Sequence, residues 1–152
     1  MSFGDTQLEL LADRLRQAPS SDPEIFSAAV GVCARFPVMR SAGKTGRSDQ
    51  LLATGAWTDA AFALLALELP AWSVRRLVYE DGEWICSLSQ QPNLPPAIDD
   101  TVDTHHPALP LAILSALVEV RAKKADGMQT DPLRVRQIGP VTDHVVCCDN
   151  FA

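Results

Sequence analysis

The sequence predicts an α+β fold in which three to four helices pack on a small antiparallel sheet. Three observations support this: an apolar helical pattern before residue 70, an alternating pattern at residues 72–89, and a second apolar helical pattern that ends near residue 124. The 152 residues can form one substantial core. We therefore expect a single domain over 1–152 that is centred on a helix–hairpin–helix core at 57–124.

Residues 1–36 predict an amino-terminal pair of helices. Leu8, Leu11 and Leu15 recur at helical spacing with charged residues between them, which is typical of an amphipathic helix. After a Pro-Ser-Ser break, Asp22 can cap a second helix and Pro23 suits its first turn. This second helix is expected to run to about residue 35. Cys33 lies on its apolar stripe and is interpreted as a small core residue.

Residues 37–50 show no apolar period and predict a flexible loop. Basic residues, including Arg40 and Arg47, alternate there with glycine and serine, and we interpret them as solvated. Gly43-Lys44-Thr45 shares three residues with a phosphate-binding loop. However, Val38 occupies the position of the required earlier glycine, and no apolar strand precedes the motif. No phosphate site is therefore predicted.

A third helix is predicted from Leu51 to Leu69, and its apolar residues surround most of its circumference. Trp72 then opens a hairpin in which Asp81-Gly82 forms a two-residue turn. This turn predicts three opposed pairs: Tyr79 with Trp84, Leu77 with Cys86, and Arg75 with Leu88.

The two faces of the hairpin are expected to differ. One face would carry Leu77, Tyr79, Trp84, Cys86 and Leu88. The other is mixed and would carry Val74, Arg76, Val78, Ile85, Ser87 and Ser89. An isolated hairpin is marginal in water, so other elements must cover it. The mixed face leaves room for a third strand layer or a dimer partner, and the three tryptophans could either close the core or form an exposed aromatic patch.

Residues 90–106 contain three prolines and three aspartates and predict an extended surface link. Thr104 or His106 can cap the helix that follows, which ends in basic residues near Lys124. In the tail, residues 125–152, two short apolar stretches could form strands.

The segment from about residue 58 to 122 resembles the bacteriophage ABA sandwich, a small domain of phage and prophage proteins. The matching residues are Leu69-Pro70-Ala71-Trp72, the turn from Asp81 to Cys86, and the Ala112-Ile113 and Ala116-Leu117 pairs. The resemblance implies the helix–hairpin–helix architecture and a phage or prophage origin. It carries over no catalytic residue.

The candidate chemistry lies among histidines and cysteines. His144, Cys147 and Cys148 in the tail, with His105 and His106, could supply zinc ligands. The chain lacks the two spaced ligand pairs of a structural zinc site, and adjacent cysteines in a strand point to opposite faces. Cys147 or Cys148 could instead act as a nucleophile with His144 or His106 as the base. The alternative reading makes these cysteines small buried residues and places His105 and His106 at a helix start.

Composition excludes several classes of function. The net charge of -6 opposes binding to nucleic acid and to anionic lipid. Glu68, Pro70 and Glu119 interrupt the apolar stretches, so none reaches the roughly 20 residues of a membrane span. The first residues lack the features of a secretory signal, and the four cysteines are expected to be reduced thiols. We expect a cytoplasmic protein without a cofactor.

These observations favour a non-catalytic interaction or assembly module of phage or prophage origin. Its partner would be another protein or a second copy that binds through the hairpin or the apolar third helix. The alternative is a small metal- or thiol-dependent enzyme that uses His144, Cys147 and Cys148.

Overall fold

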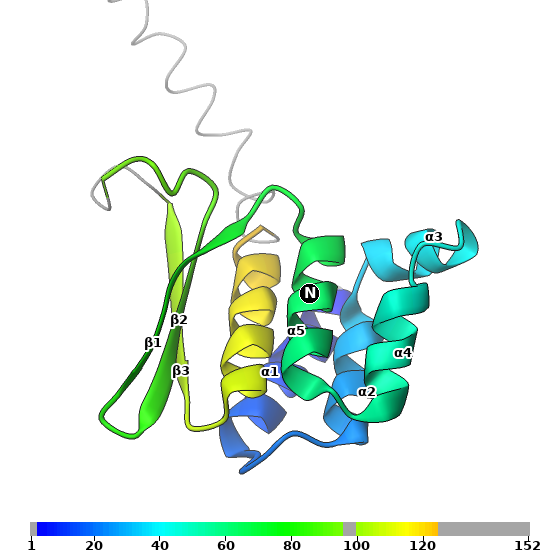
Figure 1. Ribbon diagram of the computed structural model, residues 1–152, viewed down its shortest axis with the longest axis horizontal. Helices are drawn as coiled ribbons and strands as arrows, with labels where there is room; N and C mark the ends of the chain where they lie inside the picture. Colours follow the sequence, from blue (N-terminus) through cyan, green and yellow to red (C-terminus); the bar gives the residue numbers. More distant parts are fainter. Residues whose placement is uncertain (1–2, 96–99, 125–152) are drawn as a thin grey trace, which may run out of the picture. The chain divides into compact units, whose positions relative to one another are not determined.

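The computed structural model describes residues 3–95 and 100–124, and it has the predicted α+β architecture (Figure 1). In these ranges there are six helices, more than the three to four expected, and one three-stranded antiparallel sheet. The elements are α1 (Phe3–Gln17), α2 (Pro23–Val32), α3 (Arg35–Ser41), α4 (Gly46–Thr54), α5 (Trp57–Glu68), β1 (Ser73–Glu80), β2 (Glu83–Ser89), β3 (Thr101–His106) and a sixth helix at 109–124. The proposed tail strands at 125–152 lie outside the described residues.

The amino-terminal helical pair is confirmed. Leu8, Leu11 and Leu15 point from α1 into the core. The Asp22 carboxylate accepts a hydrogen bond from the Ile25 N–H at 2.8 Å and caps α2, as its position predicts. However, α2 ends at Val32 rather than near residue 35, because the backbone turns to an extended conformation at the next position.

The flexible loop predicted at 37–50 is wrong, because this region contains most of α3 and the first half of α4. Tertiary contacts stabilise these short helices where the sequence shows no apolar period. Phe36 anchors α3 with 1% of its surface exposed. The Asp49 carboxylate joins the two helices, since it accepts hydrogen bonds from Arg40 at 2.6 Å and from the Thr45 hydroxyl at 2.8 Å.

The third helix predicted from Leu51 to Leu69 is in fact the end of α4 followed by α5. The break falls at Gly55, whose φ of 75° lies in the left-handed region that glycine adopts readily at a helix end. The backbone re-enters helical geometry at Trp57, and the Trp57 ring stacks on Phe26 of α2 at a centroid distance of 4.8 Å. α5 therefore changes direction relative to α4 and packs beside α2.

The hairpin is confirmed, with φ values of 52° at Asp81 and 83° at Gly82, as a two-residue turn requires. The pairs Tyr79–Trp84 and Leu77–Cys86 form as predicted. The Arg75–Leu88 pair is wrong, because a β-bulge after Val74 shifts the register and Val74 pairs with Leu88 instead. This shift moves Val74 to the same face of the sheet as Leu77.

Part of the predicted surface link at 90–106 is the third strand of the sheet. β3 pairs antiparallel with β2, which gives the strand order β1-β2-β3. Val102, Thr104 and His106 are buried along β3, whereas Asp103 and His105 between them are exposed. Buried polar side chains thus occupy two of the three inward positions, and the alternating apolar signal of a strand is weak.

The helix at 109–124 forms the centre of the core with its residues up to Arg121, and this part lies between the sheet and α5 (Figure 1). The Thr104 hydroxyl of β3 donates to the Ala112 carbonyl at 2.9 Å and joins this helix to the sheet. Its residues from Leu111 to Leu114 are fully buried. The predicted core, in which helices before and after the hairpin cover one face of the sheet, is therefore present.

Candidate functional site

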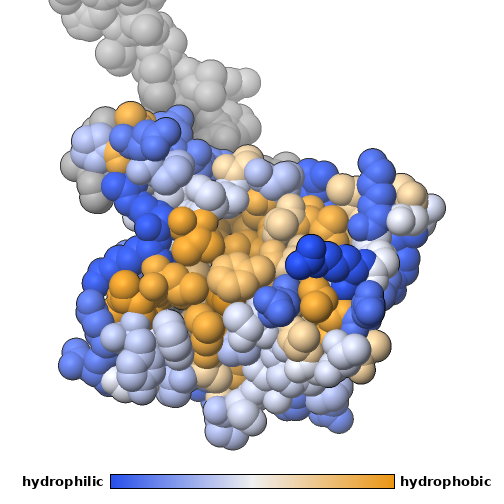
Figure 2. Space-filling model, viewed as in Figure 1, coloured by the Kyte–Doolittle hydropathy of each residue, from blue (hydrophilic) through white to orange (hydrophobic). Residues whose placement is uncertain are grey.

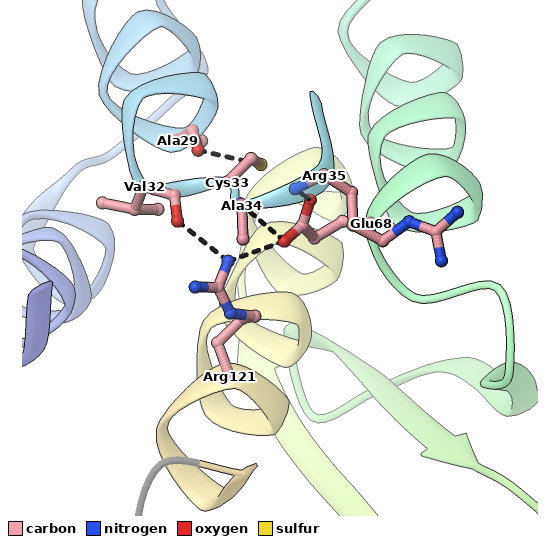
Figure 3. A network of polar contacts seen from close by, with 7 residues as sticks. All are labelled: Ala29, Val32, Cys33, Ala34, Arg35, Glu68 and Arg121. Atoms are coloured by element: carbon pink, nitrogen blue, oxygen red, sulfur yellow. Dashed lines mark hydrogen bonds and ion pairs between the residues drawn. The ribbon is translucent and has the colours of Figure 1, made fainter. Parts of the chain in front are cut away.

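A buried ion pair joins three separate parts of the chain (Figure 3). Glu68, at the end of α5, has a side chain that is only 2% exposed, and its Oε1 lies 2.7 Å from Nη1 of Arg121. Glu68 also accepts hydrogen bonds from the backbone N–H groups of Ala34 and Arg35, at 2.8 and 2.9 Å. Arg121 donates to the Val32 carbonyl at 2.8 Å. The pair therefore fixes the turn between α2 and α3 against α5 and the central helix.

Glu68 supplies the cap that α3 lacks locally. Ala34 precedes α3 and has no side chain that could accept a hydrogen bond from the first turn. A carboxylate at a helix amino terminus satisfies otherwise unpaired N–H groups and interacts favourably with the helix dipole. Both oxygens of Glu68 are already engaged. The network is therefore structural and offers no open carboxylate for catalysis or for a metal.

The cysteines in the described ranges are poor nucleophiles. Burial, and then the negative charge of Glu68, raise the pKa of the Cys33 thiol to about 12. Burial, and then the negative charge of Asp103, raise the pKa of the Cys86 thiol to about 11. Both thiols are free, and each stays protonated at neutral pH. Cys33 is the small core residue that its helical position predicts, with 6% of its surface exposed.

The structure places the two candidate histidines of β3 on opposite faces of the sheet. His106 is 4% exposed, and its Nε2 lies 2.9 Å from the Leu15 carbonyl. Its Nδ1 accepts the Ala108 N–H at 2.9 Å in the turn before the helix at 109–124, so His106 does not cap the first turn of that helix, although one reading of the sequence predicts this. With Nδ1 acting as an acceptor, the ring proton lies on Nε2 and points to Leu15. Both ring nitrogens are therefore engaged, and His106 offers no free ligand atom.

The remaining candidates, His144, Cys147 and Cys148, lie outside the described residues, so the metal and thiol hypotheses that need them stay predictions. Within residues 3–95 and 100–124, no group of three histidine, cysteine or acidic side chains is arranged to hold a metal ion. His105, exposed on the outer face of β3, stands apart from His106.

Among the hollows between elements of the described chain are three with volumes of about 230, 380 and 490 Å³. The smallest lies between β3, α1 and the central helix, and the largest lies between α1 and α2. The third lies between α2 and α4 and contains the Arg40–Asp49 ion pair. The hydrogen bond from Arg40 lowers the pKa of Asp49, so both groups are ionised and neutralise each other. This hollow therefore presents no unbalanced charge to a ligand.

An apolar surface lies between the sheet and α5 (Figure 2). We call it the apolar face and define it by three half-buried side chains on the helix-covered side of the hairpin: Val74 and Leu77 of β1 and Trp84 of β2. Tyr79 of β1 extends it, with its ring tilted against Trp84 at a centroid distance of 5.2 Å and 58% of its surface exposed. Of the three tryptophans, Trp72 closes the core, whereas Trp57 and Trp84 are half-buried and pack against it.

The strand beside the apolar face forms an open edge of the sheet. β1 pairs with β2 on one side, and no described strand pairs with its other side. On the outer face of the sheet, Arg76 and Glu80 form an ion pair at 2.7 Å that spans Val78. Among the described residues, this edge therefore combines a strand side that no other strand covers with two opposite charges that are four residues apart.

No protein-family model matches this chain, and no match was found among the curated proteins or the solved structures. The resemblance to the bacteriophage ABA sandwich therefore stays a prediction. In the part of the chain that the structure covers, no helix has both the length and the apolar character to cross a membrane.

Proposed function

We propose that this protein is a non-catalytic assembly module that associates through its apolar face. The observation that carries the proposal is the grouping of Val74, Leu77 and Trp84 on one side of the hairpin, beside an open sheet edge. Single exposed apolar residues are normal on a protein surface, whereas a contiguous apolar surface with a polar rim is typical of a protein interface.

The composition of the apolar face supports a protein partner. Aromatic side chains are enriched in the centres of protein interfaces, because they bury a large area and lose little conformational entropy. Trp84 and the adjoining Tyr79 supply two of them. The net charge of -6 weighs against nucleic acid as the partner. The phage or prophage origin and the cytoplasmic location belong to the same proposal. They rest on the resemblance and on the free thiols Cys33 and Cys86, which suit a reducing compartment.

The first test replaces Trp84 with serine, and we expect this change to weaken self-association measured by sedimentation velocity over a range of protein concentrations. The substitution removes the aromatic side chain that β2 contributes to the apolar face. A central interface aromatic contributes roughly 2 kcal/mol or more, so the association constant should fall at least about tenfold.

Val38→Ser is the matched control, because Val38 is an apolar residue of α3 outside the apolar face and is 69% exposed. This variant should associate like the wild-type chain. A wild-type chain that sediments as a monomer at every concentration, or two variants that associate equally well, would contradict the proposal.

A further inference from the structure

We propose that the partner is a second copy of this chain, and that the two β1 strands pair antiparallel about a twofold axis at Val78. This inference rests on the proposed assembly function and specifies its partner and its register. It follows from three properties of β1: the direction in which its backbone groups point, the registers in which these groups can pair with a second β1, and the positions of Arg76 and Glu80.

The turn geometry shows which backbone groups of β1 point outward. In a two-residue hairpin, the residues that flank the turn form a hydrogen-bonded pair, and bonded and non-bonded pairs then alternate along the ladder. Glu80 pairs with Glu83 across this turn, so Val78–Ile85 is the next bonded pair. The N–H and C=O groups of Leu77 and Tyr79 therefore point away from β2, toward the open edge.

The outward groups allow only a few twofold registers. A second β1 must bring outward-pointing residues opposite one another, so the axis can pass through Leu77, Val78 or Tyr79. With the axis at Leu77, the second bonded pair would require Arg75, which lies at the β-bulge. With the axis at Tyr79, Leu77 would lie opposite Asp81 in the turn. With the axis at Val78, Leu77 pairs with the partner's Tyr79, and Tyr79 pairs with the partner's Leu77. Only this axis keeps both hydrogen-bonded pairs within the regular part of β1.

The charges favour the same register. With the axis at Val78, Arg76 lies directly opposite the partner's Glu80, and the partner's Arg76 lies opposite Glu80. Opposite charges on facing positions stabilise a strand pair, and like charges destabilise it. With the axis at Leu77, Arg76 would lie opposite the partner's Val78. With the axis at Tyr79, Glu80 would lie opposite the partner's Val78. The strand is thus complementary to itself in one register, which is the requirement for a twofold interface.

The same register extends the apolar face across the dimer. Leu77 and the exposed Tyr79 lie on the helix-covered side of β1, opposite Cys86 and Trp84 of β2. Across the axis, each Leu77 would meet the partner's Tyr79. The exposed aromatic would then be covered by the second copy, and the two three-stranded sheets would form one sheet of six strands.

Charge also protects natural strand edges from unwanted pairing, so the Arg76–Glu80 pair could serve that purpose instead. The two roles predict different results for charge reversal. If the pair protects the edge, reversing one charge leaves the chain monomeric in all combinations. If it forms the dimer contact, two defective variants with opposite charge should restore each other.

The experiment uses the full chain with two single variants, Arg76→Glu and Glu80→Arg, whose mass is measured by sedimentation equilibrium. Each variant would place like charges opposite one another at both contacts, and we expect its self-association to weaken on the order of 100-fold. An equimolar mixture of the two should form a heterodimer, because every facing pair is then of opposite charge. The double variant should form a homodimer again.

Arg14→Glu is the control for a charge reversal elsewhere, since Arg14 lies on α1, where its side chain is 49% exposed. Circular dichroism confirms that each variant is folded. The register is wrong if Arg76→Glu dimerises like the wild-type chain, or if the mixture stays monomeric. If those results occur while Trp84→Ser still weakens association, the assembly function stands and only the register fails. A monomeric wild-type chain would overturn both.

Discussion

Replacing Glu68 with alanine should lower the free energy of unfolding by about 3–5 kcal/mol, because it leaves a partly buried guanidinium and two backbone donors without their acceptor. Breaking a buried ion pair costs far more than the pair itself contributes, since the remaining charge stays desolvated. Chemical denaturation followed by circular dichroism measures this change directly.

A double-mutant cycle separates the contribution of the Glu68–Arg121 ion pair to stability from the contribution of the Glu68 cap on α3. Removing Arg121 as well eliminates the uncompensated charge. The free energy of unfolding of the Glu68→Ala/Arg121→Ala variant should therefore fall by less than the sum of the decreases in the two single variants. Glu24→Ala is the surface control, because Glu24 is 87% exposed and lies 3.7 Å from Arg14. Its effect should stay within about 1 kcal/mol. A Glu68→Ala variant as stable as this control would show that the network does not hold the helices together.

Replacing Phe36 with alanine should also cost about 3–5 kcal/mol, the usual range for removing a fully buried aromatic side chain. Phe36 anchors α3, and the guanidinium of Arg40 lies 4.8 Å from the centre of its ring. We expect the unfolding midpoint to fall in a denaturant titration, with no change of its slope if the remaining core is intact.

Val38→Ala provides the comparison within the same helix, since Val38 is 69% exposed. Its unfolding free energy should stay within about 0.5 kcal/mol of the wild-type value. Equal effects of Phe36→Ala and Val38→Ala would mean that α3 does not dock on the core, and the sequence prediction of a loop at 37–50 would regain support.

The hairpin and the apolar helices could be predicted because their signals are local. Asp81-Gly82 specifies a two-residue turn, and the alternation on both sides sets the first two cross-strand pairs. The β-bulge could not be predicted, because nothing in the residues around Arg75 distinguishes a bulged strand from a regular one. That single shift moved Val74 from the mixed face to the helix-covered face.

The elements that sequence reasoning missed are stabilised by distant partners. The first turn of α3 is capped by Glu68, which lies more than thirty positions further along the chain. Buried positions of β3 carry Thr104 and His106, whose hydrogen bonds go to Ala112 and Leu15. Local periodicity records neither kind of contact, so both segments looked like surface.

The candidate site likewise combines a residue that the local sequence indicates with others that depend on distant parts of the chain. Glu68 was readable as a charge that directly follows the apolar run at residues 60–67, and a buried charge needs a partner. Arg121 gave no comparable signal, since a basic residue near a helix end is ordinarily explained by the helix dipole. The open edge of β1 followed from the strand order, which depends on β3 and could not be derived from the hairpin alone.

The most direct test of a self-paired β1 is amide hydrogen exchange at Leu77 and Tyr79, measured at several protein concentrations. Both N–H groups point to the open edge of the isolated sheet, whereas in the dimer each donates to the partner strand. Their protection should therefore rise together with the dimer fraction, while the protection of Val78, which is bonded within the hairpin, should change little. Fast exchange at Leu77 and Tyr79 in a sample whose mass is that of a dimer would contradict the account.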